Sequence, residues 1–274
     1  MKKFGTFLFH LLWLALLTLL TQIGGVVWLV ALGIGGWLRG KFSLRFLNVL
    51  VFLVLYLLAT AVAVPLAARR FGRVPLPVFA NPHLKPENGL FALLNRHYVR
   101  PELRRALEDV ALQMQARYPG AVVWYMDANF PFIDGYPLEP HFSHKDGKKV
   151  DIAFYWKDRA SGKLLDGTPS LIGYGACAEP LPGEYDYAAD CESKGYWYIS
   201  LDKTLAEPFF DKNKCSFETA MTSELARLLA EHPVIGKILI QTHLEKRLGL
   251  ERYDKFRQQG CKAARHDDHF HVQI

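Results

Sequence analysis

The chain has 274 residues, half of them hydrophobic, and a formal net charge of +6. Its length allows one or two domains and a substantial core. The charge does not point to nucleic acid, because residues 1–73 hold eight basic and no acidic side chains, which leaves 25 basic against 27 acidic side chains in the remainder. We therefore expect no nucleic-acid partner.

Two long apolar runs occupy the N-terminal part of the chain. Residues 4–38 and 46–68 contain no Asp, Glu, Lys or Arg, and each run exceeds the roughly 20 residues that a membrane helix needs. As one continuous helix the first run would measure about 52 Å, against a hydrocarbon core of about 30 Å. Gln22 and the pair Gly24–Gly25 near its middle mark either a turn between two helices or a kink. Residues 1–73 are therefore predicted to form a membrane anchor with two or three crossings.

The distribution of positive residues favours three crossings. In that arrangement the cytoplasmic side carries five basic side chains and the outer side three, whereas two crossings would place three inside and five outside. The five are Lys2, Lys3, Arg39, Lys41 and Arg45. The C-terminal part of the chain is then expected outside the membrane. A cleaved signal peptide is not expected, because the first apolar stretch is too long for one and a second follows it.

A proline-rich linker is predicted for residues 74–90, followed by a domain over residues 91–274. Helices are expected at 87–98 and 101–118, where Pro101 suits the first turn of the second helix. Apolar and β-branched patterns predict one more helix and several strands further on. The helix is expected at 215–233, and the strands at 121–127, 148–156, 195–202, 237–241 and 269–274. This mixture without regular alternation predicts an α+β fold, with a small antiparallel sheet flanked by helices.

Two short segments hold five of the ten histidines. In the first, His144 and Asp151 bracket an Asp146-Gly147 turn signal that can fold the histidine back toward the aspartate. In the second, His269 and His271 are two apart, so in a strand they face the same side. Two imidazoles and one carboxylate would give Zn²⁺ three protein ligands and leave one position for water. The alternative is a solvated, histidine-rich tail.

Four cysteines lie after the apolar runs, and none has the CxxC spacing of a zinc or redox motif. They are Cys177, Cys191, Cys215 and Cys261. An even number fits disulfides in an oxidising compartment, and the alternative is four reduced, buried thiols. Three pairings are possible; we expect Cys177 with Cys191 and Cys215 with Cys261.

Residues 143–151, SHKDGKKVD, and residues 266–271, HDDHFH, resemble the paired signatures of a zinc peptidase superfamily. That superfamily unites D-alanyl-D-alanine dipeptidases and carboxypeptidases, penicillin-insensitive murein endopeptidases, lysostaphin-type enzymes and the hedgehog signalling domain. The HDDHFH run is most similar to the murein endopeptidases. The resemblance covers about residues 120–274; it is strong at the two motifs and weak between them.

The resemblance implies a role for each matching residue. One Zn²⁺ ion would be held by His144, Asp151 and His271. His269 matches a second active-site histidine, and Asp268 takes the place of a glutamate that acts as the general base, so the base is either Asp268 or His269.

Three further residues would support this centre. His266 and His141 are expected to orient the ligands through hydrogen bonds. Arg265 is a candidate to hold the transition-state oxyanion or a substrate carboxylate.

The function that the resemblance implies is zinc-dependent hydrolysis of amide bonds in peptidoglycan peptides, first of all in murein cross-links. The first alternative is a D,D-carboxypeptidase or dipeptidase that trims stem peptides. A second is a non-catalytic zinc-containing binding domain, as in the hedgehog branch. The expected location is the bacterial cytoplasmic membrane, with the domain in the periplasm or outside and peptidoglycan peptides as its partners.

Overall fold

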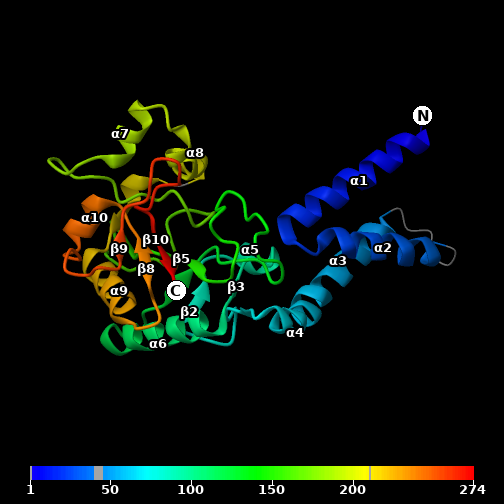
Figure 1. Ribbon diagram of the computed structural model, residues 1–274, viewed down its shortest axis with the longest axis horizontal. Helices are drawn as coiled ribbons and strands as arrows, with labels where there is room; N and C mark the ends of the chain where they lie inside the picture. Colours follow the sequence, from blue (N-terminus) through cyan, green and yellow to red (C-terminus); the bar gives the residue numbers. More distant parts are fainter. Residues whose placement is uncertain (1, 40–45, 210) are drawn as a thin grey trace.

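The computed structural model describes residues 2–39, 46–209 and 211–274. A group of apolar helices at the N-terminal end projects from a folded domain that contains the C-terminus (Figure 1). These helices are α1 Lys2–Thr21, α2 Gly24–Leu38, α3 Leu47–Leu58, the π-helix η1 Ala59–Ala63, α4 Val64–Ala68 and the 3₁₀ helix η2 Arg69–Phe71. Lys41 and Arg45, which we expect on the cytoplasmic side, lie outside the described residues.

The first apolar run is a hairpin of two helices rather than one kinked helix. Between α1 and α2, Gln22 adopts a left-handed conformation with φ of 66°. A Cβ atom at Gly25 would lie 2.0 Å from Oγ1 of Thr18 and 2.7 Å from the carbonyl oxygen of Leu14. Glycine therefore allows α2 to approach α1 closely directly after the turn.

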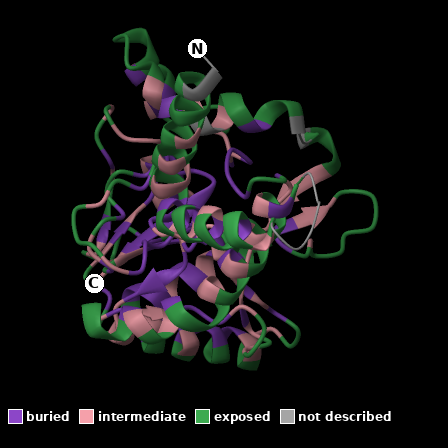
Figure 2. Cartoon of the chain, turned by 90° about the vertical axis from the view of Figure 1, so that its right-hand side faces the viewer, coloured by how far each residue is buried: buried purple, intermediate pink, exposed green. Residues whose placement is uncertain are grey.

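Two helices are long and apolar enough to span a membrane. They are Phe4–Thr21 and the continuous helical stretch Leu47–Phe71, and the shorter Gly24–Leu38 is also apolar. Only 6% and 11% of the two long segments are buried within the structure. In Figure 2 these helices are therefore mainly green, whereas the strands of the domain are mainly purple. The described part of the chain leaves most of their apolar side chains uncovered.

The domain is built on a six-stranded sheet in the order β2-β4-β5-β10-β8-β9. Its strands are β2 Leu84–Pro86, β4 Val123–Tyr125, β5 Lys149–Ala153, β8 Lys237–Leu239, β9 Phe256–Arg257 and β10 His269–Gln273. The four central strands are antiparallel, as expected, but β2 and β9 join the edges in parallel. The sheet is therefore mixed rather than purely antiparallel.

Helices α6 Pro101–Arg117 and α9 Thr219–Glu231 pack on one face of the sheet. Their apolar side chains share one core with alternate residues of the two central strands. Those strand residues are Val150, Ile152, Phe270 and Val272. Because side chains alternate along a strand, the residues between them point to the opposite face. That face carries the polar side chains of the candidate site.

The predicted linker is part of the domain. Residues 74–90 contain β1 Val74–Pro75 and β2, and the side chains of Leu76 and Leu84 are buried in the core. β1 pairs with β3 Tyr98–Val99. The expected helix at 87–98 is reduced to α5 Gly89–Leu93, because the chain then turns at Asn95, which has φ of 58°.

The strand expected at 195–202 is wrong, since this segment forms the 3₁₀ helix η3 Trp197–Ser200 and α8 Leu201–Ala206. Ile199 packs on Cys191 and Ala188 instead of on a neighbouring strand. Aromatic and β-branched residues favour a strand only where another strand can pair with it. The remaining elements are β6 Trp156–Asp158, α7 Tyr187–Ser193, η4 Glu207–Phe209, η5 Lys212–Lys214, β7 Cys215–Phe217 and α10 Thr242–Arg247.

The expected disulfide pairing is also wrong. Cys191 in α7 is bonded to Cys261, with 5.4 Å between their Cα atoms, while Cys177 and Cys215 are free. The partners are 70 residues apart in the sequence. Tertiary packing beside Ile199 brings them together, and sequence proximity therefore misled the prediction.

Candidate metal centre

The centre lies on the polar face of the two central strands. β5 and β10 are antiparallel, and their register places His271 directly opposite Asp151 and His269 opposite Ala153. Opposite residues on antiparallel strands point to the same face and have close Cβ atoms. Asp151, His269 and His271 are all buried.

His144 reaches this pair from the turn that precedes β5. Gly147 adopts φ of 78°, and the Asp146 carboxylate accepts a hydrogen bond from the backbone of Lys148 at 2.9 Å. This is the turn predicted from the Asp-Gly pair. It places His144 Nε2 at 3.2 Å from Asp151 Oδ1.

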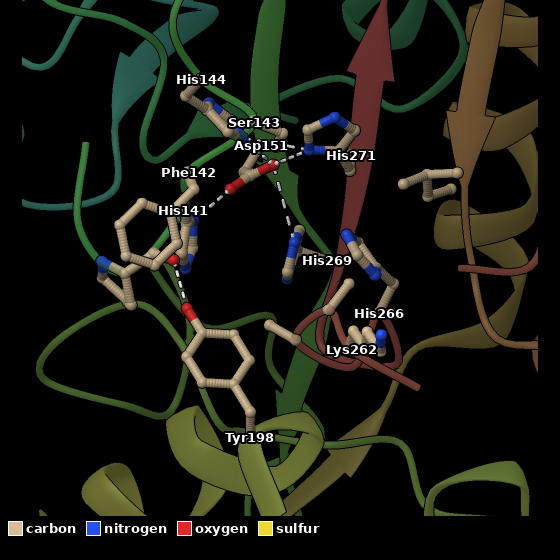
Figure 3. Close-up of a pocket in the computed structure, with 14 residues that line it drawn as sticks. His141, Phe142, Ser143, His144, Asp151, Tyr198, Lys262, His266, His269 and His271 are labelled. Carbon is tan, nitrogen blue, oxygen red and sulfur yellow. Dashed lines mark hydrogen bonds and ion pairs between the residues drawn. The ribbon is translucent and has the colours of Figure 1, made fainter. Parts of the chain in front are cut away.

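Three potential ligand atoms converge at this point (Figure 3). His271 Nδ1 lies 3.0 Å from Asp151 Oδ1 and 3.0 Å from His144 Nε2. The other ring nitrogen of His144 lies 2.6 Å from the carbonyl oxygen of Ala128. Because a carbonyl can only accept, Nδ1 carries a proton, and Nε2 is the ring atom that faces Asp151 and His271.

The second oxygen of Asp151 is held by two other side chains. Oδ2 accepts a hydrogen bond from the Tyr174 hydroxyl at 2.8 Å and lies 2.9 Å from His141 Nδ1. The Tyr174 hydroxyl in turn accepts from the backbone of Asp127 at 3.1 Å. His141, His144 and Asp151 form a buried group, with ligand atoms within 4.8 Å of one another, that could hold a metal ion.

Electrostatics favour the protonation states that bind metals. Burial alone would raise the pKa of Asp151, but the nearby His144 and His269 rings hold that pKa well below its usual value. Burial lowers the pKa of His271 to about 4. Asp151 is therefore ionised and His271 neutral at pH 7. Burial, with the charges on Asp127 and Asp151, raises the pKa of Tyr174 well above its usual value, so its hydroxyl remains a donor.

Asp268 and His269 form a buried dyad beside the three converging atoms. One oxygen of Asp268 accepts from the backbone of Gly175 at 2.6 Å, and the other lies 2.5 Å from His269 Nδ1. The other ring nitrogen of His269, Nε2, lies 3.6 Å from Asp151 Oδ1. Burial lowers the pKa of His269, but the carboxylates of Asp268 and Asp151 outweigh it, and the net pKa is raised.

The structure does not bring Arg265 to this centre. Its buried guanidinium pairs with both oxygens of Asp267 and with Glu179. His266, by contrast, lies next to the dyad, with 4.8 Å between the His266 and His269 ring centroids. Burial, with the neighbouring His269 and His271 rings, lowers the pKa of His266 well below its usual value.

A cavity of about 190 Å³ opens in front of these side chains. Its lining includes all five clustered histidines and Asp151, together with Phe142, Tyr198 and Lys262 (Figure 3). The Tyr198 hydroxyl donates to the carbonyl of Pro140. Lys262 contributes a cationic side chain from the same loop as Arg265.

Sequence reasoning missed Tyr174, Tyr198 and Lys262. The one local signal was the Gly-Tyr-Gly run at 173–175, where both glycines adopt positive φ. Such a run indicates a backbone that needs left-handed conformations at both glycines. It does not reveal that the tyrosine between the glycines reaches Asp151. Tyr198 and Lys262 lie in the two segments that the Cys191–Cys261 bond joins, and neither belongs to the two motifs.

No protein-family model matches the chain, and no curated protein has significant sequence similarity to it.

Proposed function

We propose that the chain is a membrane-anchored zinc peptidase that cleaves peptide cross-links in peptidoglycan. The observation that carries the proposal is the triangle of His144 Nε2, Asp151 Oδ1 and His271 Nδ1, whose sides measure 3.0 to 3.2 Å. Ligands of a tetrahedral Zn²⁺ ion with bonds of about 2.0–2.1 Å lie about 3.3 Å apart. The donor set of two imidazoles and one carboxylate also fits a catalytic zinc site.

The neighbouring groups fit the role of supports for these ligands. The backbone carbonyl of Ala128 fixes the tautomer of His144, while Tyr174 and His141 fix the orientation of Asp151. Partners of this kind orient metal ligands and tune their basicity. We assign His141 the same orienting role, although its ring nitrogen lies close enough to Asp151 and His144 to bind the metal itself.

His269 is the general base of the proposed reaction, and Asp268 positions it. A bound Zn²⁺ ion supplies an acidified water molecule and a polarised carbonyl group. Nε2 of His269 faces the ligand triangle and takes up the proton of the attacking water. Asp268 holds the ring through Nδ1 and stabilises the protonated form, as a carboxylate does in a catalytic triad.

The membrane location rests on the apolar helices and on the disulfide. The exposed surfaces of Phe4–Thr21 and Leu47–Phe71 suit a bilayer by length and composition. The Cys191–Cys261 bond fits an oxidising compartment outside the cytoplasm. A domain held there can reach peptidoglycan.

The second candidate function is a D,D-carboxypeptidase, and Lys262 favours it. Its side chain lines the cavity that also contains the ligand triangle and could bind the terminal carboxylate of a stem peptide. The muropeptide products distinguish the two reactions.

The test uses the full-length, zinc-loaded protein in detergent with purified murein sacculi. Asp151→Asn preserves the shape of the buried side chain but removes its charge, so we expect it to lose bound zinc and to lower turnover to background. Asp166→Asn, at an exposed position, is the matched control and should retain both. Zinc is measured by elemental mass spectrometry, and products are measured as muropeptides.

Three outcomes would decide between the functions. Loss of cross-linked dimers with the wild-type protein but not with Asp151→Asn supports the endopeptidase. Loss of terminal D-alanine in the same comparison supports the carboxypeptidase. Stoichiometric zinc without any change in muropeptides would favour the binding domain. Full zinc and full activity in Asp151→Asn would remove the assigned centre.

A further inference from the structure

One short segment of the domain is attached to the middle of the second long apolar helix. The Tyr56 hydroxyl in α3 donates to the backbone carbonyl of Leu93, at the end of α5, at 2.7 Å. The Asn95 side chain donates to the Tyr56 hydroxyl at 3.2 Å and to Oγ1 of Thr60 at 3.4 Å. Figure 1 shows α5 on the side of the domain that faces these helices.

The position of Tyr56 along α3 sets the depth of α5 in a membrane that this helix crosses. Tyr56 lies nine residues after Leu47, the first residue of α3, which corresponds to about 14 Å of helix. The hydrocarbon core of a bilayer is about 30 Å thick. If Leu47 lies at the inner boundary, α5 is attached well below the outer boundary, and any tilt of the helix lowers it further. Leu93, at the end of α5, is therefore attached near the midplane of the bilayer, at the inner limit of the outer leaflet.

The side chains of α5 suit this level. Leu90 and Leu93 are 53% and 41% exposed. Exposed leucines on a short helix are unfavourable in water but favourable in contact with acyl chains. A second contact agrees, since the Tyr136 hydroxyl donates at 2.7 Å to the carbonyl of Thr18, near the tip of the α1–α2 hairpin.

A second cavity begins at α5 and ends at the candidate metal centre. It measures about 200 Å³ and is lined on one side by Leu90, Phe91 and Leu94. Its other side includes His141 and Tyr174, the two side chains that hold Asp151 Oδ2. Pro140 and His141 also line the cavity in front of the histidines. The two cavities are thus adjacent and meet at Pro140 and His141.

We propose that the α5 cavity opens to the outer leaflet and accepts the apolar part of a lipid-borne peptide substrate. The lipid chain would lie along Leu90 and Leu94, and the attached peptide would extend past His141 toward the ligand triangle. This inference rests on the proposed function for the reaction on the peptide. The position of α5 in the leaflet does not depend on that reaction and can be tested separately.

The first experiment measures the position of α5 in the full chain reconstituted in phospholipid vesicles. Leu90→Cys and, as control, Leu112→Cys in α6 are labelled with a nitroxide, with Cys177 and Cys215 replaced by serine. Leu112 is 56% exposed, close to the exposure of Leu90. We expect the label at 90 to collide more with oxygen than with a water-soluble nickel chelate, and the label at 112 to do the reverse. Equal, water-like values at both positions would overturn the proposal.

The second experiment tests the substrate class. The same peptide, which carries both a D,D-cross-link and a terminal D-alanine, is supplied either free or coupled to a phospholipid headgroup in the vesicles. For each variant we take the kcat/KM for the lipid-borne peptide divided by the kcat/KM for the free peptide. In Leu90→Asp this ratio should fall about tenfold. A tenfold loss corresponds to the free energy of removing roughly two methylene groups from lipid. Leu112→Asp should leave this ratio unchanged.

The two failures are distinguishable. An unchanged ratio in Leu90→Asp, with both peptides hydrolysed, would overturn the lipid-borne substrate and leave the peptidase intact. If the wild-type protein hydrolyses neither peptide, the proposed function and the substrate class fail together, while the nitroxide result still decides where α5 lies.

Discussion

At the scale of single residues, the Asp268–His269 dyad allows a test of the proposal that His269 is the base and Asp268 positions it. Asp268 is buried and bound on both oxygens, by Gly175 and by His269. His269 is the member that faces the ligand triangle. Asp268→Asn would place an amide NH₂ group against Nδ1 and so force the proton of the ring onto Nε2. We expect kcat to fall by about 10²- to 10⁴-fold, the usual contribution of a general base.

The accompanying measurements separate positioning from metal binding. Bound zinc and KM should be unchanged in Asp268→Asn, because the three ligand atoms remain. Asp268→Glu, which restores the carboxylate, should recover part of kcat. Wild-type kcat in Asp268→Asn would show that His269 does not need this partner.

At the scale of elements, the Cys191–Cys261 bond fastens α7 to the loop that enters β10. That loop carries Lys262, and His266 follows it. The bond closes a loop of 70 residues, for which chain entropy gives about 4 kcal/mol of stabilisation. Cys191→Ser with Cys261→Ser should therefore lower the Tm of the full-length protein by about 10 °C.

The free cysteines provide the matched control. Cys177→Ser with Cys215→Ser removes the same number of thiols and no bond, and it should shift Tm by much less. A reductant should reproduce the effect of the first double variant in the wild type and have no effect on that variant. Equal Tm values for the two double variants would contradict the structural role of the bond.

At the scale of the whole molecule, the contacts between helices and domain link the expected number of crossings to the side on which the N-terminus lies. The domain binds Thr18 and Gln22 at the end of the α1–α2 hairpin and also Tyr56 in α3. The hairpin tip and the domain are therefore on the same side. Together with the positive residues of the N-terminal segment, this predicts a cytoplasmic N-terminus.

Protease protection in spheroplasts tests this topology. A peptide tag at the N-terminus should survive external protease, while a tag inserted after the exposed Gly162 should be removed. Disruption of the membrane should expose the N-terminal tag. Digestion of both tags in intact spheroplasts would indicate two crossings with the N-terminus outside.

Much of the fold follows from local patterns. The helix at 101–118 and the strands at 148–156 and 269–274 were predicted and are confirmed as α6, β5 and β10, because their apolar residues recur with the period of the element. The turn at Asp146-Gly147 was predicted from the residue types of this pair, and Gly147 has the positive φ that such a turn needs. The strand at 195–202 failed because β propensity needs a partner strand, which no local pattern supplies.

The sequence by itself determined the two apolar runs, the alternation of β5 and β10, and the residue types of a metal site in two motifs, since these properties depend on near neighbours in the chain. Tertiary structure alone decided the register of His271 opposite Asp151 and the hydrogen bond from Tyr174 to Asp151. It also decided the partner of Cys191 and the diversion of Arg265 to Asp267 and Glu179. Each of these joins side chains through packing of the whole domain, where distance along the chain no longer limits contact.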